Sequence, residues 1–405
     1  MQADSRMNSV RFALSGVPRG VWVLGFVSML MDISSEIIHA LLPVYLVTVM
    51  GASTLFVGLI EGISEASAAL AKVVSGMLSD RLAKRRPLVA LGYGLAALSK
   101  PAFPLALSLN WIIAARIVDR VGKGIRGAPR DALIADLSPD GLRGASFGLR
   151  QALDTMGAVI GPLLALLGMW FTANNFKLVF WLAVVPGFLS FALAAFAVPE
   201  PERTSAQAQH PIVFKREVIT ALGRRFWLVI AIAAIFTLAR FSEAFLILRA
   251  QSAGLSVAYV PLVLVVMNVA YAAAAYPAGA LSDSEDRYRL LSWSLVPLIA
   301  ADLFLATATG LGSVFAGIAL WGLHLALSQG LLSALVADTA PASLRGTAFG
   351  IFSFVTGIAL LLASVIAGAV WDTAGPSATF ATGAGIAVAA LVGLYLSRQR
   401  DEVVT

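Results

Sequence analysis

The residues with the clearest chemical potential lie in one stretch, 110–136, which is long enough to cross a bilayer and yet carries several charged side chains. They are Arg116, Asp119, Arg120, Lys123, Arg126 and Arg130. At about 100° per residue these positions occupy roughly a third of a helix circumference, so they share one face. Because a charge near the bilayer centre costs at least a few kcal/mol, this face must line a polar, water-filled interior.

Acidic residues in the first two apolar stretches could carry protons. Asp32, Glu36 and His39 share one face of a predicted helix, and Glu61 and Glu65 share a face of the next. Desolvation raises the pKa of a carboxylate and a nearby arginine lowers it, so moving an arginine could switch protonation. We expect Asp32 and Glu65 to bind a proton, with Glu36 and Glu61 next. The alternative is a static ion-pair network that neutralises the neighbouring bases.

A metal site is a further alternative for the same acids. Asp32, Glu36 and His39 could ligate a divalent cation together with His324, because carboxylate and imidazole suit such metals. The chain has no cysteine, which removes the soft ligands, and many bases lie close to these acids in the sequence. We therefore predict no metal site.

The sequence contains no pattern typical of an enzyme. Residues 122–127 satisfy G-x-G-x-x-G, but a dinucleotide site needs a preceding strand, and here the pattern lies inside a predicted membrane helix. Neither G-x-x-x-x-G-K-[ST] nor H-E-x-x-H occurs, and only 3 histidines are present. We expect neither catalysis nor a cofactor.

The composition predicts a polytopic membrane protein. Of the 405 residues, 59% are hydrophobic and 13% are charged, whereas a soluble chain is about a quarter charged. Hydropathy predicts an all-α chain with twelve membrane spans. They are 20–49, 55–78, 87–107, 110–136, 143–169, 176–198, 226–249, 257–281, 288–309, 312–338, 344–371 and 376–396.

The basic residues lie almost entirely on one side of these spans. They cluster before the first span, after the second, in the linker, after the eighth and at the C-terminus. The positive-inside rule places both termini in the cytoplasm and suggests a bacterial inner membrane. Because the net charge of +6 follows this topology, it predicts no nucleic-acid partner.

The chain is a tandem repeat. Residues 76–86 match residues 279–289, and residues 132–148 match residues 334–350, at offsets of 203 and 202. The one long polar interruption divides the chain into an N-terminal six-helix bundle (1–198), a cytoplasmic linker (199–225) and a C-terminal six-helix bundle (226–405). Six helices repeated in parallel orientation indicate a transporter, with the substrate site between the halves.

At its repeated loop the chain resembles the major facilitator superfamily, over essentially its whole length. The signature G-x-L-x-D-R-x-G-R-K/R of that family is matched after the second span by Gly76, Leu78, Asp80, Arg81, Lys84 and Arg85. The second-half copy keeps Gly279, Leu281 and Asp283. The resemblance implies that this patch latches the halves in one gating state. The small Gly76 would permit close helix approach.

Two further family features bear on function. Gly157, Gly161 and Pro162 match a fifth-helix pattern that the family associates with proton-coupled antiporters, although close packing and a proline kink explain them equally well. Helices one, four, seven and ten line the cavity in the family. The resemblance therefore implies that cavity residues include Asp32, Glu36, Arg116, Asp119, Arg120, Lys123 and Arg126, with Arg240, Glu243, His324 and Gln329 from the second half.

These observations predict an alternating-access transporter that exports a small organic molecule in exchange for protons. The excess of bases in the expected cavity favours an anionic or zwitterionic amphiphile as substrate. A proton-linked importer of an organic anion, a divalent metal-ion exporter and a non-transporting sensor or scaffold stay as alternatives. We expect the substrate, protons and the lipid bilayer as partners, and a functional monomer.

Overall fold

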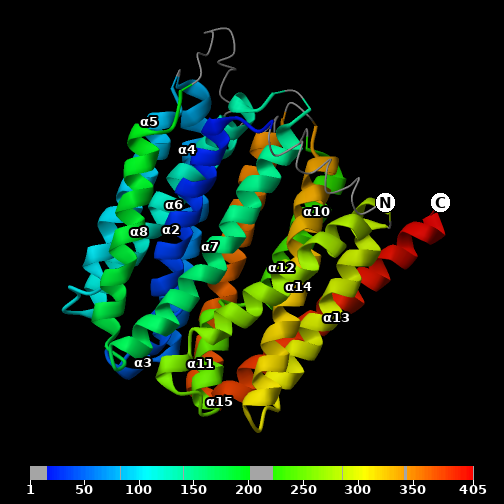
Figure 1. The fold of residues 1–405 in the computed structure, drawn as a ribbon. Helices are drawn as coiled ribbons and strands as arrows, with labels where there is room; N and C mark the ends of the chain where they lie inside the picture. The colour runs from blue at the N-terminus through cyan, green and yellow to red at the C-terminus, as the bar shows by residue number, and fades with distance from the viewer. Residues whose placement is uncertain are drawn as a thin grey trace, which may run out of the picture.

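The computed structural model describes residues 16–82, 84–139, 141–200, 222–284, 286–341 and 344–404. Within these ranges all regular structure is helical, which confirms the predicted all-α class (Figure 1). The first helix group comprises α2 (Arg19–His39), α3 (Leu42–Thr48), α4 (Thr54–Arg81), α5 (Arg86–Ser99), η1 (Lys100–Ala102), α6 (Leu109–Leu137), α7 (Arg143–Phe171) and α8 (Phe176–Phe196). The second comprises α10 (Gly223–Ala239), α11 (Ala244–Ser252), η3 (Val257–Tyr259), α12 (Leu262–Ser284), α13 (Arg287–Ala306), α14 (Leu311–Thr339) and α15 (Arg345–Val404).

Among the described residues, 9 helical stretches are long and apolar enough to cross a membrane. Helix α6 is not one of them because of its charges, and α5 is too short by itself, with 14 residues. The long α15 is interrupted at Gly375, whose φ of 85° lies in the left-handed region. Twelve spans stay a prediction, whereas a multi-pass membrane fold is established.

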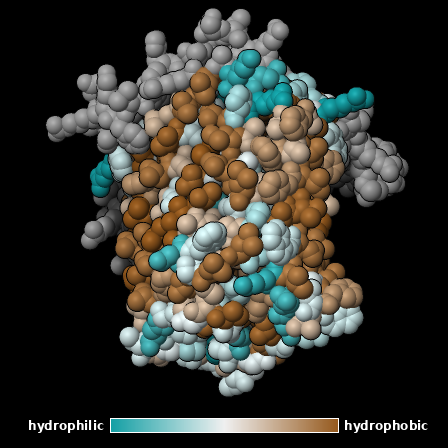
Figure 2. All heavy atoms as spheres, turned by 90° about the vertical axis from the view of Figure 1, so that its left-hand side faces the viewer, coloured by the Kyte–Doolittle hydropathy of each residue, from teal (hydrophilic) through white to brown (hydrophobic). Residues whose placement is uncertain are grey.

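The outer surface of the molecule suits a lipid environment. Apolar side chains cover much of the upper and middle part of the face shown in Figure 2, and hydrophilic side chains lie above them and in patches across the lower part. On α8, for example, Val185 is 62% exposed and Leu189 is 52% exposed. A large contiguous apolar surface of this kind would be unfavourable in water and is covered by acyl chains in a bilayer.

The two helix groups lie side by side, and two pairs of long helices make most of the contact between them (Figure 1). Helix α4 packs against α15, where a side chain at Gly58 would overlap the backbone oxygen of Ser364. Helix α7 packs against α12, where Asn268 Nδ2 donates a hydrogen bond to the oxygen of Ala158 at 2.8 Å. Most of the predicted linker lies outside the described residues.

The glycines of the sequence motifs have different structural roles. A Cβ added at Gly157 would lie 2.7 Å from the oxygen of Met29, and one at Gly161 would lie 2.6 Å from Glu36 Cβ. These two glycines therefore allow α7 to approach α2. In contrast, a Cβ at Gly76 would meet only Ala128 Cβ at 3.4 Å, so close approach does not require a glycine there. The tight α4–α6 contact lies instead at Gly124, where a Cβ would overlap the backbone oxygen of Ala68.

Part of the signature loop after α4 lies within the described residues. Arg85 is buried, and its Nη1 lies 2.9 Å from Asp136 Oδ2 at the end of α6. Lys84 is exposed. The side chains of Asp80, Arg81 and Asp283, and the surroundings of Gly279, lie outside the described part, so the proposed latch stays a prediction. Pro162 lies inside α7.

Candidate functional site

A cavity of about 680 Å³ lies between the two helix groups. Helices α2, α4, α6 and α7 line it from one side, and α10, α12, α14 and α15 line it from the other. Its volume falls within the range of roughly 300–1,000 Å³ that is typical of small-molecule sites. The cavity therefore lies between the two helix groups, which is where the repeat predicted the substrate site.

The cavity is closed at the end of the molecule where α3 and α11 lie (Figure 1). Helix α3 packs against α11 at that end, and Asp372 of α15 accepts hydrogen bonds from the backbone nitrogens of Thr54 (3.0 Å) and Leu55 (2.9 Å) at the start of α4. Farther along α4 and α6, the lining residues Lys72 and Lys123 are exposed. The cavity therefore opens toward the end where α2 begins.

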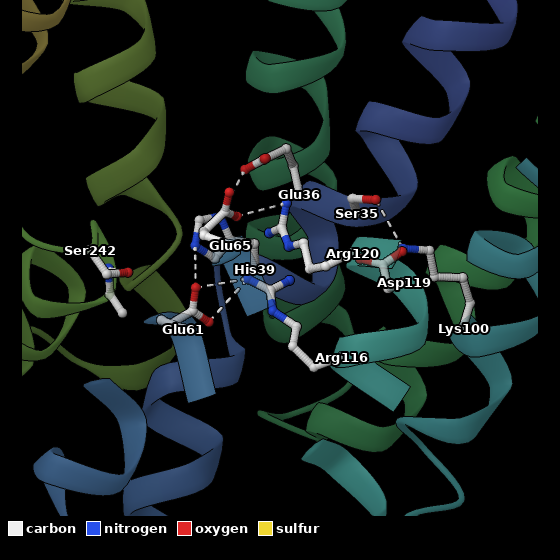
Figure 3. A network of polar contacts seen from close by, with 11 residues as sticks. Ser35, Glu36, His39, Glu61, Glu65, Lys100, Arg116, Asp119, Arg120 and Ser242 are labelled. Atoms are coloured by element: carbon white, nitrogen blue, oxygen red, sulfur yellow. Dashed lines mark hydrogen bonds and ion pairs between the residues drawn. The ribbon is translucent and has the colours of Figure 1, made fainter. Parts of the chain in front are cut away.

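Buried ion pairs lie at the closed side of this cavity (Figure 3). Arg116 Nη2 of α6 lies 3.0 Å from Glu61 Oε1 and 2.9 Å from Oε2 on α4. His39 of α2 lies between two acids, with Nε2 3.8 Å from Glu61 Oε2 and Nδ1 3.6 Å from Glu36 Oε2. Arg116 is 1% exposed and Glu61 is 3% exposed. Such buried charges are tolerated because each has a partner of opposite sign.

Two more ion pairs extend the network from α6 (Figure 3). Lys100 Nζ of η1 lies 2.6 Å from Asp119 Oδ1 and donates to Ser35 Oγ at 2.9 Å. Arg120 Nη1 lies 3.3 Å from Glu65 Oε1 on α4. Lys100, Asp119 and Arg120 are all buried. The charges of α6 in this region therefore hold the first helix group together.

A second cluster lies nearer the open end. Arg130 Nη1 donates to Ser28 Oγ at 2.6 Å, and its Nη2 lies 3.0 Å from Asp131 Oδ1. Arg150 pairs with Asp154, one helical turn later on α7. Arg130, Asp131 and Asp154 line the cavity, so this part of its surface is polar but internally neutralised.

Other charged residues of the cavity lining form no ion pair with any described residue. They are Asp32, Lys72, Lys123, Arg126, Arg240 and Glu243. The guanidinium of Arg126 lies 4.7 Å from the ring centroid of Tyr93, a cation–π distance. Arg126 is only 4% exposed, and its Nη1 has no hydrogen-bond partner. An unsatisfied buried donor that faces a cavity is well suited to receive an anionic group of a ligand.

The second helix group supplies a wall that is nearly free of charge. Except for Arg240 and Glu243, its lining residues are neutral, and they include Phe236, Tyr271 and Phe352. His324 belongs to this wall, but its Nδ1 lies 2.7 Å from the oxygen of Ser294 and its ring stacks on Phe236. The cavity is thus amphiphilic, with a charged wall from one group and a largely apolar or neutral polar wall from the other.

Comparison with known proteins identifies the family. The profile of the Major Facilitator Superfamily matches residues 24–267 and, again, residues 228–404. The chain belongs to the Major Facilitator Superfamily. It is 36% identical over 386 residues to the uncharacterized MFS-type transporter MJ1317 of Methanocaldococcus jannaschii, a match that covers 93% of this chain and 94% of that protein.

Less similar proteins also match. The quinolone resistance protein NorA of Staphylococcus aureus is 23% identical over 218 residues, which is 54% of either chain. The human organic anion transporter MFSD10 has a similar fold, with a TM-score of 0.65 and 20% identity, over 93% of this chain and 100% of that one. At such identity the structural likeness concerns the fold alone.

Within this superfamily fold, many of the predicted site residues line the cavity. They are Asp32, Glu36, Glu65, Lys123, Arg126, Arg240, Glu243, His324 and Gln329. Arg116, Asp119 and Arg120 were expected to face the cavity but are buried beside it, because Glu61, Lys100 and Glu65 on neighbouring elements neutralise them. No group of three metal-binding side chains lies together in the described part of this superfamily member.

Sequence reasoning missed two polar residues in this part of the superfamily fold. Lys72 lines the cavity without an ion pair, and Lys100 is the buried partner of Asp119. The position of Lys72 on the acidic face of α4 was a signal that could have placed it in the cavity. Lys100 is the one charged residue of the predicted span 87–107, and an isolated charge inside a span was a signal that it has a buried partner, although not which one.

Proposed function

We propose that the protein exports a small anionic or zwitterionic amphiphile in exchange for protons, by alternating access of the central cavity. The single observation that carries this proposal is the unlike nature of the two cavity walls. Unpaired cations on α4 and α6 suit an anionic group, whereas the neutral, partly aromatic wall of the second helix group suits an apolar body. A cavity that is closed at one end and open at the other corresponds to one of the two gating states of an alternating-access transporter.

Four cations (Lys72, Lys123, Arg126 and Arg240) and two anions (Asp32 and Glu243) of the lining lack an ion-pair partner among the described residues, which favours a zwitterion as well as an anion. Lys72, Lys123 and Arg126 can bind the anionic part. Asp32 and Glu243 lie on opposite helix groups and can bind a cationic part or a proton. A purely apolar or purely cationic substrate would leave these basic groups unsatisfied in a confined space, which disfavours such a ligand.

The basic helix ends lie together at the open end of the molecule, so the positive-inside rule suggests that this end is cytoplasmic and the cavity inward-facing, a state that importers and exporters share. Export is supported by a relative over half of the chain, NorA, which is by name a quinolone resistance protein. MFSD10, which shares the fold, is named an organic anion transporter. Import of an organic anion with protons uses the same residues and differs in the sign of the proton flux.

Asp32 is the residue that we propose as the proton carrier of the cavity. It lines the cavity on α2 and has no ion-pair partner among the described residues, whereas Glu61 and Glu65 each contact an arginine. A carboxyl group without a fixed counter-charge can exchange a proton at smaller structural cost than one in a buried pair. Glu65, and after it Glu36 and Glu61, are the next candidates.

The test is proton movement in proteoliposomes loaded with a pH-sensitive dye. A zwitterionic quinolone (norfloxacin), an aromatic anion (p-aminohippurate) and an aromatic cation (ethidium) are added in turn. We expect the first two to drive a proton flux that Asp32→Asn abolishes. Asp131→Asn, which alters an ion-paired carboxylate of the same cavity, serves as the matched control and should retain the flux. A flux that survives in Asp32→Asn refutes the carrier assignment, and a flux driven only by ethidium refutes the proposed substrate class.

A further inference from the structure

A carboxyl group is buried without a partner far from the charged wall. Asp302 of α13 is 0% exposed, and neither of its carboxyl oxygens has a hydrogen-bond partner in the described part of the chain. The other buried acids among the described residues each contact a base: Glu61 contacts Arg116, and Asp119 contacts Lys100. An unsatisfied buried carboxyl group requires a specific explanation.

The surroundings of Asp302 are aromatic and tightly packed. A Cβ added at Gly383 of α15 would lie 2.7 Å from Asp302 Oδ2 and 3.0 Å from Phe241 Cε1, so the carboxyl group and this ring meet at Gly383. The Phe241 ring lies 5.4 Å from that of Trp321 and 5.3 Å from that of Phe380. Trp321 is fully buried, and its Nε1 also lacks a partner. An ionised carboxylate in this apolar setting would carry a large desolvation cost.

The internal repeat shows what is missing at Asp302. Helices α6 (Leu109–Leu137) and α14 (Leu311–Thr339) have the same length and lie 202 positions apart. At this offset Lys100 corresponds to Asp302 and Asp119 corresponds to Trp321. The first helix group therefore holds a lysine–aspartate pair, with 2.6 Å between Nζ and Oδ1, where the corresponding positions of the second group hold Asp302 and Trp321, and neither side chain has a hydrogen-bond partner among the described residues. The same place in the repeat is charge-compensated once and uncompensated once.

No neighbouring element supplies a counter-charge within the described residues. Arg249 of α11 uses its guanidinium for the backbone oxygens of Leu305 (2.8 Å) and Ala308 (3.0 Å). His324 of α14 binds the oxygen of Ser294, and Arg240 and Glu243 face the cavity.

Other charged residues of the packed elements lie near helix ends, and Arg289 lies in the first turn of α13, 13 residues before Asp302. Arg287 pairs with Asp338 where α13 begins and α14 ends. Asp372 of α15 caps α4, and Arg345 begins α15. Arg224 and Arg225 lie at the start of α10. Neutralisation of Asp302 must therefore come from a bound proton.

We propose that Asp302 is a second proton-binding site, protonated in this conformation and able to release its proton when the closed end of the cavity opens. Phe241 lies in the break between α10 and α11, and the cavity residues Arg240 and Glu243 flank it. Opening the end where α11 packs against α3 must move this break and its ring. Water can then reach Asp302, the carboxyl O–H bond breaks, and the proton passes to water, leaving a carboxylate.

This role in coupling rests on the proposed proton exchange, but protonation itself can be tested without any substrate. Infrared spectroscopy of the protein in lipid separates the carbonyl stretch of a protonated carboxyl group from the bands of a carboxylate. The native-minus-Asp302→Asn difference spectrum at neutral pH should contain one carboxylic-acid band. Asp119→Asn is the matched control, because Asp119 is a buried carboxylate that is paired with Lys100. Its difference spectrum should contain no carboxylic-acid band. Absence of the band from the Asp302→Asn difference spectrum overturns the proposal.

The gated release needs a second measurement. The chain has no cysteine, so the pair Thr54→Cys and Asp372→Cys introduces a single disulfide that locks the closed end. In deuterated water the Asp302 band should shift slowly in the oxidised protein and at least tenfold faster after reduction. Equal rates would show that opening does not expose the group. Should Asp302→Asn fail to fold, Asp302→Glu is used, and its band should be displaced rather than lost.

Failure of this inference and failure of the proposed transport function give different results. In the dye-loaded proteoliposomes, Asp302→Asn should lower the norfloxacin-driven proton flux at least tenfold. A flux equal to that of the native protein, together with the infrared band, would make the proton of Asp302 purely structural and overturn its role in coupling. The infrared result does not depend on any of the added compounds.

Discussion

Asp372 joins the two helix groups at the closed end through a single carboxylate. Its Oδ1 lies 3.0 Å from the nitrogen of Thr54, its Oδ2 lies 2.9 Å from the nitrogen of Leu55, and the Thr54 hydroxyl also donates to it. These nitrogens lie in the first turn of α4 and therefore have no hydrogen-bond partner within the helix itself. A carboxylate of α15 therefore caps a helix of the opposite group, and the cap exists only while this end is closed.

The magnitude of its contribution follows from known capping energies. A capping side chain contributes about 0.5–2 kcal/mol, and a negative charge at a helix N-terminus adds about 0.3–1 kcal/mol. Asp372 is exposed, so the lower part of these ranges applies. We expect Asp372→Ala to destabilise the closed end by about 1 kcal/mol. At about 1.4 kcal/mol per factor of ten, the open-to-closed ratio rises about fivefold. Asp372→Asn keeps an acceptor and should have a smaller effect.

Thiol labelling from the side of α3 and α11 measures this ratio. Leu361 of α15 is partly buried against Gly62 of α4, so a cysteine at Leu361 becomes more accessible when these helices separate. The labelling rate of Leu361→Cys should rise about fivefold on addition of Asp372→Ala, by the estimate above. Asn175→Ala is the control, because Asn175 caps α8 within one group by accepting from the nitrogen of Leu178 at 3.2 Å. An unchanged rate with Asp372→Ala, or an equal rise with Asn175→Ala, would refute the cross-group cap.

Three other predictions concern the packing and the cavity. In thermal unfolding, Glu61→Gln or Arg116→Met alone should destabilise the protein by about 3–5 kcal/mol, because each leaves a buried charge unpaired. The double variant should be less destabilised than either single variant. A double variant destabilised by the sum of the two single effects would contradict the pairing. Gly58→Ala places a methyl group against the oxygen of Ser364, so the same thiol-labelling assay should detect a more open end, and an unchanged rate would show that the contact yields. Lys123→Gln should weaken binding of p-aminohippurate at least threefold and leave ethidium unaffected, with a smaller difference at high salt. Equal losses for both compounds would argue against an anion site.

The membrane fold and the position of the site could be predicted from local patterns. The face of the stretch 110–136 was recognisable because a helix repeats every 3.6 residues, and the structure has α6 over Leu109–Leu137. The tandem repeat was visible in the loop motifs, and it implied a cavity between two similar groups of helices. For Gly157 and Gly161 the sequence left close helix packing and an antiporter motif equally open, and the structure shows that both glycines permit the close approach of α7 to α2.

By itself, the sequence determined that this chain crosses a membrane repeatedly, that it is duplicated, and that one helix face is too charged to meet lipid. Hydropathy, repeat offset and helical period are properties of neighbouring residues, so they need no knowledge of packing. Only the tertiary structure decided which charges are available. Arg116 and Lys123 lie on one helix face, yet Glu61 neutralises the first and nothing described pairs with the second. Lys100 finds Asp119, whereas Asp302 finds no base. Ion pairing depends on side chains of other helices within a few ångströms, and the spacing along one segment does not specify them.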